Sequence, residues 1–103
     1  MMLLFSNSYM PECGAYELTP LTLNEFVWYI LNTEFTSYVR LEHIADHIED
    51  VTNVHVKVTT DTPTLVNGQT IIICEVRRDS RTRKSGRKEY VYRKAVFFEW
   101  EAA

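Results

Sequence analysis

Apolar and polar residues follow two different periods along the chain, and each period predicts one kind of element. Met2–Ser6 is a short apolar run, which is typical of a buried central strand. Residues 7–20 contain Pro11, Gly14 and Pro20, and this composition predicts a loop that crosses the surface. The first strand is therefore expected to lead into a long stretch without regular structure.

Two later segments show the apolar spacing of amphipathic helices. Thr22 and Glu25 fit a capping box, in which the hydroxyl and the carboxylate each accept from the other residue's backbone amide. The helix that this box opens is expected to end near Asn32. A second helix is expected from about Arg40 to Thr52. The apolar stripes are Leu23, Phe26, Val27, Ile30 and Leu31 in the first helix, and Leu41, Ile44, Ala45, Ile48 and Val51 in the second.

Four further segments have the composition or the alternation of strands. They are Phe35–Val39, Val54–Thr59, Thr70–Val76 and Glu89–Trp100. Asn67-Gly68 is a strong turn signal before the third of these segments. Together the elements predict an α/β (α+β) fold: a mixed, mostly antiparallel sheet of about five strands with two helices on one side.

The 103 residues, 46% of them hydrophobic, suit one domain that spans 1–103. No stretch approaches the ~20 apolar residues of a membrane helix, so no membrane partner is expected. Cys13 and Cys74 lie far apart and outside any metal-type spacing. Reduced thiols in an intracellular protein are therefore expected.

The charge is unevenly distributed along the chain. Residues 77–94, here called the basic segment, hold nine of the eleven Lys and Arg residues and only two acids. Residues 79–88 within it are expected to form the tip of a hairpin. Such concentrated positive charge marks a site for phosphate-bearing partners, although a solvated hairpin tip explains the same pattern. Six of the nine cations are arginines, which suit bidentate phosphate contacts.

Several landmarks of the chain resemble a small α/β family spread by viruses and mobile elements. They are Leu3-Leu4-Phe5-Ser6-Asn7-Ser8, Gly14-Ala15-Tyr16-Glu17, Pro20-Leu21-Thr22-Leu23, Phe35-Thr36-Ser37, Val54–Val58, Asn67-Gly68, Ile71–Arg78 and Ala95–Trp100. The family includes type III anti-CRISPR ring nucleases, which cut cyclic tetra-adenylate, and anti-Thoeris sponges, which sequester cyclic ADP-ribose signals. The resemblance implies a viral anti-defence protein in the host cell cytoplasm, working as a homodimer or a higher homo-oligomer.

The chain departs from the ring nucleases at the positions that cut. Their catalytic His stands at the start of the second helix, where this chain has Leu41, and an alkyl side chain is no general acid. Their strand-terminal Arg corresponds to Arg78, while the acidic position that follows falls near Arg81. The comparison implies that the protein binds and sequesters a messenger without turnover.

The predicted ligand is a cyclic oligonucleotide or a cyclic ADP-ribose-type signal. Arginines of the basic segment are expected to neutralise its phosphates, while polar residues after the first strand fix its position. The predicted contacts are Asn7, Ser8, Thr59, Arg77, Arg78, Arg81 and Arg83. No catalytic residue, metal or cofactor is predicted.

Other sequence features leave alternatives open. A ring nuclease would need His43 as a replacement acid, whereas a nucleic-acid-binding protein would insert the basic hairpin into a groove. Direct inhibition of a defence protein is a further version of binding. His43 and His47 have a spacing that suits a metal, but no third ligand is near in sequence. Tyr90 and Tyr92 would either stack on a base or pair across a strand.

Overall fold

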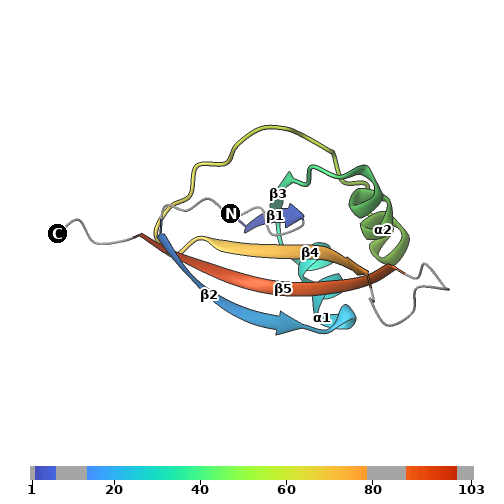
Figure 1. Cartoon of the computed structure of the whole chain (residues 1–103), viewed down its shortest axis with the longest axis horizontal. Coiled ribbons are helices and arrows are strands. Elements are labelled where there is room, and N and C mark those ends of the chain that lie inside the picture. Colours follow the sequence, from blue (N-terminus) through green and yellow to red (C-terminus); the bar gives the residue numbers. More distant parts are fainter. Residues whose placement is uncertain (1, 7–13, 79–87, 100–103) are drawn as a thin grey trace.

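The computed structural model describes residues 2–6, 14–78 and 88–99, without the side chains of Arg78 and Lys88 (Figure 1). Two helices and five strands form one domain. In chain order they are β1 (Met2–Ser6), β2 (Gly14–Leu21), α1 (Leu23–Asn32), β3 (Phe35–Tyr38), α2 (Glu42–Thr52), β4 (Thr70–Arg78) and β5 (Lys88–Glu99). Within the described residues neither helix is long and apolar enough to cross a membrane.

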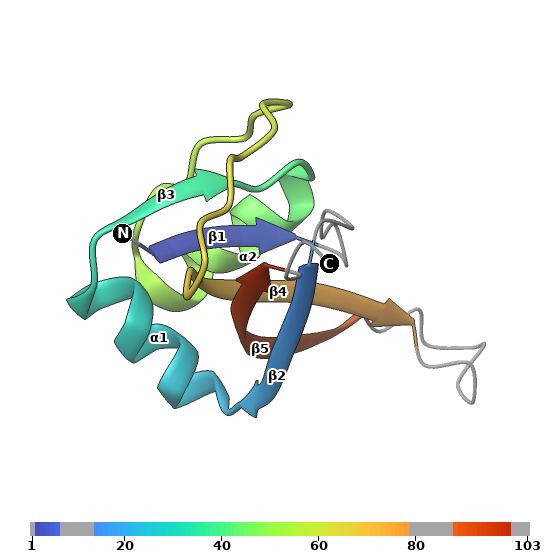
Figure 2. The ribbon, with the colours of Figure 1, turned by 90° about the vertical axis from the view of Figure 1, so that its left-hand side faces the viewer.

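The strands form one mixed sheet in the order β2-β5-β4-β1-β3. β1 runs parallel to both of its neighbours, β3 and β4, whereas β5 runs antiparallel to β2 and β4. The antiparallel ladders are the longer ones, and the predicted mixed five-stranded fold is confirmed. Because β1, β3 and β4 are parallel, their carboxyl ends point toward the same edge of the sheet, here called the carboxyl edge (Figure 2).

Both helices cover the same face of the sheet, here called the helix face. Phe26 and Ile30 of α1 and Ile44 and Ile48 of α2 share one buried cluster with Leu4 of β1. In Figure 1, α1 lies behind β4 and β5. Burial of these apolar faces stabilises the fold and fixes the helices on the sheet. The other members of the cluster are Met2, Val39, Ala45, Val56, Ile72, Cys74 and Tyr92.

The opposite face carries a second core, to which the segment 53–69 contributes Leu65, and it is here called the loop face. The segment begins at the helix face, where Val56 is buried, and ends at the loop face. It passes the outer edge of β3, where the Ser37 hydroxyl donates to the Lys57 carbonyl over 2.9 Å. Strand residues in this core are Leu3, Phe5, Ile71, Ile73, Ala95 and Phe97.

The capping box predicted for α1 is confirmed. The Glu25 amide donates to the Thr22 hydroxyl at 3.2 Å, and the Thr22 amide donates to the Glu25 carboxylate at 3.0 Å. These bonds satisfy amides that the first helical turn leaves without an intrahelical partner. α2 starts at Glu42, two residues later than predicted, and ends at Thr52. The C-cap residue Asn53 follows in the left-handed region, with φ 60°.

Two predictions about strands are wrong. One predicted strand is not formed and one unpredicted strand is, so the number of strands is still five. Residues 54–59, expected to be a strand, join no ladder of the sheet. Among the alternating valines Val56 is buried, whereas Val58 is left 38% exposed, so this segment does not present one continuous buried face. Gly14–Leu21, expected to be a loop, is the edge strand β2, paired with β5. Pro20 is tolerated there because an edge strand has one side whose amides need no partner strand.

Candidate functional site

The carboxyl edge has a step in it, because β4 extends beyond its neighbour β1. Ser6, the last residue of β1, pairs with Cys74, and β4 continues for four residues to Arg78. At about 3.3 Å per residue, β4 projects roughly 13 Å past the end of β1. Ligands of open α/β sheets commonly bind beyond the carboxyl ends of their strands. Arg77 therefore stands beside the position where such a ligand would lie.

A second cation reaches the same edge from β3. The Arg40 amide donates to the Ser6 hydroxyl over 3.1 Å, which ties the residues after β3 to the end of β1. The Arg40 side chain is half-buried, and its Nη2 donates to the Asp61 carbonyl at 3.4 Å. The Thr59 amide donates to the Val39 carbonyl at 2.9 Å, so the segment 53–69 holds this arginine near the edge.

Arg77 belongs to a group of charged residues on the loop face near the carboxyl edge. The β4–β5 register places Arg77 opposite Glu89 and Arg93 opposite Ile73. Since alternate residues share a face, Glu75, Arg77 and Arg93 are on the same face as Ile73. Glu75 is only 8% exposed, whereas Arg77 is exposed and Arg93 half-buried. The loop face is thus apolar in its middle and charged toward the carboxyl edge.

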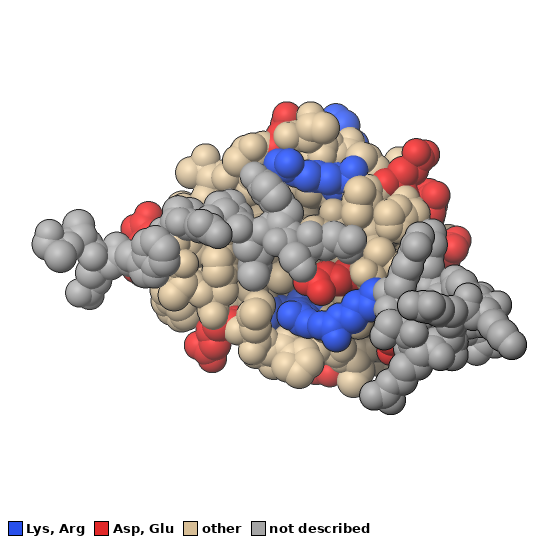
Figure 3. All heavy atoms as spheres, in the orientation of Figure 1, with Lys and Arg blue, Asp and Glu red and all other residues tan. Residues whose placement is uncertain are grey.

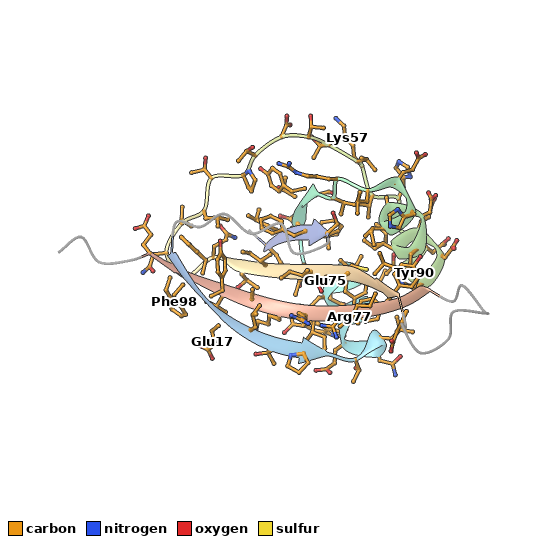
Figure 4. The ribbon with its side chains drawn as sticks, viewed as in Figure 1. Glu17, Lys57, Glu75, Arg77, Tyr90 and Phe98 are labelled. Carbon is orange, nitrogen blue, oxygen red and sulfur yellow. The ribbon has the colours of Figure 1, made fainter. Side chains whose placement is uncertain are left out.

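Figures 3 and 4 show this charged part of the loop face. Basic side chains form a band over β4 and β5, directly beside acidic atoms, and a second basic group lies nearer β3 (Figure 3). Glu75 and Arg77 lie beside one another in the first region, and Lys57 lies well apart, beyond β3 (Figure 4). In this view the two basic groups lie on either side of the end of β1.

Behind this edge, the helix face presents an aromatic cluster. His47 of α2 stacks on Tyr90 with ring centroids 3.4 Å apart, and its Nε2 is hydrogen-bonded to the Tyr92 hydroxyl at 2.6 Å. Tyr92 is 8% exposed and stacks on Phe26 at 4.5 Å. Burial, followed by the neighbouring Cys74 and Tyr90, raises the pKa of Tyr92 to about 12. Tyr92 therefore has no ring face for a ligand base.

The same contacts bear on the metal alternative, and burial decides the reactivity of the Cys74 thiol. His47 points its Nε2 at Tyr92, and residues 2–6, 14–78 and 88–99 contain no group of three His, Cys, Asp or Glu placed to hold a metal ion. Cys74 is buried, and burial, with the neighbouring Glu75 as a second cause, raises the pKa of its thiol to about 12. Its thiol is therefore protonated and unreactive at neutral pH.

The described residues include part of the predicted site. Arg77 and Thr59 both lie near the carboxyl edge, although the Thr59 hydroxyl already accepts from the Asp61 amide at 3.1 Å. Arg78 is the last residue of β4, and only its backbone is described. Leu41 precedes α2 as its N-cap and packs against the helix-face core. The remaining predicted contacts lie outside the described residues: Asn7, Ser8, Arg81 and Arg83.

Two charged residues of this edge were missed by sequence reasoning. Arg40 directly follows the predicted strand 35–39, and that position at a strand end was the available signal. Glu75 lies within an apolar strand and is buried. A lone carboxylate in such a strand is unusual, and this was the available signal. Both matter because they add charged groups after β3 and within β4 to the contacts predicted at this edge.

Acidification is expected to destabilise the protein through His47. Burial lowers the pKa of His47, an effect that nearby Asp50 partly opposes. Because the folded pKa lies below the ordinary value of about 6.5, this stability is present above pH ~6.5 and is lost as the pH falls through the folded pKa. Urea unfolding between pH 5 and 8 should show the decline.

His47→Gln should flatten that decline, since glutamine keeps a polar partner for Tyr92 but does not titrate. His43→Gln, one turn earlier on α2, is the matched control and should retain the pH dependence of the unmodified protein. An unchanged pH dependence in His47→Gln would show that other groups cause the acid sensitivity.

No protein-family model matches the chain, and the curated proteins contain no significant match to it. Neither comparison tests the resemblance to ring nucleases and sponges, which stays a prediction. The fold and its carboxyl edge define a small α+β domain with a mixed five-stranded sheet, in which cations from three strands or strand ends lie around the end of β1.

Proposed function

We propose that the protein binds an anionic, nucleotide-derived ligand at the carboxyl edge and holds it without turnover. The observation that carries this proposal is the gathering of Arg40, Arg77 and Arg93 around the end of β1. Outside the basic segment the chain has only Arg40 and Lys57 as cations against twelve acids. One cationic edge on an otherwise acidic protein favours a compact anion over a long polyanion.

The chemistry of the edge suits phosphates that are carried by a nucleoside. Guanidinium groups donate pairs of parallel hydrogen bonds to phosphate oxygens, and three of them allow more than one phosphate to be held. A cyclic oligonucleotide or a cyclic ADP-ribose-type signal carries phosphates of this kind.

Sequestration without cutting is supported by the residues at the start of α2. Leu41 occupies the position where the resembling nucleases have their catalytic His, and it packs against the core. The physiological role we propose is viral anti-defence in the host cytoplasm: tight binding lowers the free concentration of an immune messenger. A homodimer would double the number of arginines around a symmetrical ligand.

The proposal is tested by incubating the protein with cyclic di-, tri- and tetranucleotides and cyclic ADP-ribose, then measuring bound mass and subunit count by native mass spectrometry. We expect one of these ligands to be retained and to be recovered intact after denaturation. Steady accumulation of linear product would overturn the proposal in favour of a ring nuclease, and His43→Gln would then be expected to stop it.

A duplex-DNA titration is the control for the nucleic-acid alternative. A groove-binding hairpin releases many counterions, so its affinity falls steeply with salt, whereas a small ligand makes fewer phosphate contacts. We expect only the weak, non-specific affinity of roughly 10⁻⁴–10⁻⁶ M for the duplex at physiological salt. Nanomolar duplex binding with a steep salt dependence, and no nucleotide bound, would contradict the proposed function.

A further inference from the structure

A hollow lies at the opposite edge of the sheet, away from the carboxyl edge. It contains about 540 Å³ and includes Met2 and Thr70, the first residues of the parallel strands β1 and β4. This volume is within the range of small-molecule sites in proteins. The remaining lining residues are Tyr29, Thr33, Glu34, Val66, Asn67, Gly68, Gln69 and Lys94.

Lys94 is the cation of this hollow, and its surroundings are unusual for a lysine. It is half-buried on β5 and follows the loop-face residue Arg93, so it is on the helix face. Its ammonium lies 5.6 Å from the centroid of the Tyr29 ring. Among the described residues this ring is its one specific partner, and no carboxylate forms an ion pair with it. A half-buried cation that meets only a ring face retains hydrogen-bonding capacity for an anion.

The turn at residues 66–69 forms one wall of the hollow, and hydrogen bonds within the protein fix it. Residues 66–69 form a turn in which the Gln69 amide donates to the Val66 carbonyl at 2.9 Å and Gly68 adopts φ 83°. Phe97 of β5 anchors this turn twice, because its carbonyl accepts from the Gly68 amide at 2.7 Å and its amide donates to the Gln69 carbonyl at 2.9 Å. A preformed wall reduces the ordering that binding would otherwise require.

The other wall comes from the carboxyl end of α1. The Thr33 amide donates to the Tyr29 carbonyl at 3.1 Å, which places both residues at the hollow. Val66 is 57% exposed and offers an apolar surface on the facing side. Glu34 is exposed in the lining and repels a ligand of high negative charge.

We propose that this hollow binds a small organic monoanion: one carboxylate on a flat apolar body. The anionic group would accept from Lys94 and from the Thr33 hydroxyl, and the flat body would lie against Tyr29 and Val66. This site is separate from the proposed nucleotide site, since Lys94 and Arg93 are neighbours on opposite faces of β5.

Benzoate and the neutral analogue benzamide test the proposal in an amide-resolved NMR titration of the intact protein. We expect saturable shifts at Tyr29, Thr33, Gln69 and Lys94 with benzoate, and at least tenfold weaker binding of benzamide. This comparison uses the unmodified protein, so it does not depend on a variant that folds. No saturable shifts with benzoate, or equal binding of benzamide, would overturn the proposal.

Lys94→Gln and Arg93→Gln form a matched pair of neighbouring substitutions. Lys94→Gln should weaken the anion at least tenfold while leaving nucleotide binding unchanged, and Arg93→Gln should do the reverse. Unchanged anion affinity in a folded Lys94→Gln protein would show that the lysine only packs against Tyr29. Failure of the nucleotide experiment alone leaves this result intact, so the two proposals fail separately.

Discussion

Replacing Phe26 with alanine is expected to lower the free energy of unfolding by about 3–5 kcal/mol. Phe26 is fully buried in the helix-face core and stacks on Tyr92 with ring centroids 4.5 Å apart. The substitution removes a large apolar surface and leaves a cavity between α1 and the sheet, which a short helix has little freedom to close. Urea unfolding followed by far-UV circular dichroism measures the change.

Leu23→Ala on the same helix is the control, because Leu23 is 44% exposed. Its loss should lower the free energy of unfolding by no more than about 1 kcal/mol, as surface substitutions usually do. If Phe26→Ala lowered the free energy of unfolding by no more than about 1 kcal/mol, α1 would contribute little to the core. If Leu23→Ala lowered it by about 3–5 kcal/mol, the exposed side of α1 would be covered in solution.

Replacing Arg77 and Arg93 together with glutamine is expected to reduce affinity for the nucleotide ligand by at least a hundredfold. Each charge-assisted hydrogen bond contributes about 1.5–3 kcal/mol, and 1.4 kcal/mol corresponds to a factor of ten. Both side chains are on the loop face near the carboxyl edge, so both contacts would be lost from one ligand. Isothermal titration calorimetry with the ligand identified by mass spectrometry gives the affinities.

Lys57→Gln is the matched control for net charge. Lys57 is exposed on the segment 53–69 and lies far from Arg77 in Figure 4. The Lys57→Gln substitution should change the affinity for the nucleotide ligand less than threefold, since a distant exposed charge is screened by salt. If Lys57→Gln reduced the affinity as much, per charge removed, as the double arginine variant, the result would indicate general attraction instead of a site. A large fall in melting temperature for the arginine variant would show that the arginines are structural.

Local signals in the sequence predicted the helices well because their causes act within one turn. The Thr22–Glu25 capping box is an interaction between residues three apart, and it forms as the pattern indicates. The apolar spacing also identified Phe26 and Ile30 as buried, but it included Leu31, which is 56% exposed. A stripe of period 3.6 gives the direction of the buried face and not its width.

Strand identity was less predictable, because a strand needs a partner that is distant in sequence. Val54–Thr59 has the stronger alternation, yet Gly14–Leu21 pairs with β5 and carries a proline. The segment 53–69 instead covers the edge of β3, and Val56 and Leu65 of this segment pack into the two cores. Alternation suggests that a segment is half-buried, but it does not report whether a partner strand pairs with that segment.

The candidate site likewise depends partly on the sequence alone and partly on the tertiary structure. The concentration of cations in residues 77–94, and the segregation of acids elsewhere, are properties of the chain that no folding alters. The placement of Arg40 depends on the parallel pairing of β1 and β3 and on a hydrogen bond to Ser6, 34 residues away. No local pattern reports a contact across that distance in sequence.

The sequence alone thus determined the helices, the mixed α+β class and the uneven charge, since each depends on residue type and short-range spacing. Only the tertiary structure decided which extended segment joined the sheet and which cations share a face. It also placed Lys94 over Tyr29 and beside the turn at Gly68. The physical reason is that strand register and edge position result from competition among long-range pairings, and one residue of slip moves every side chain to the other face.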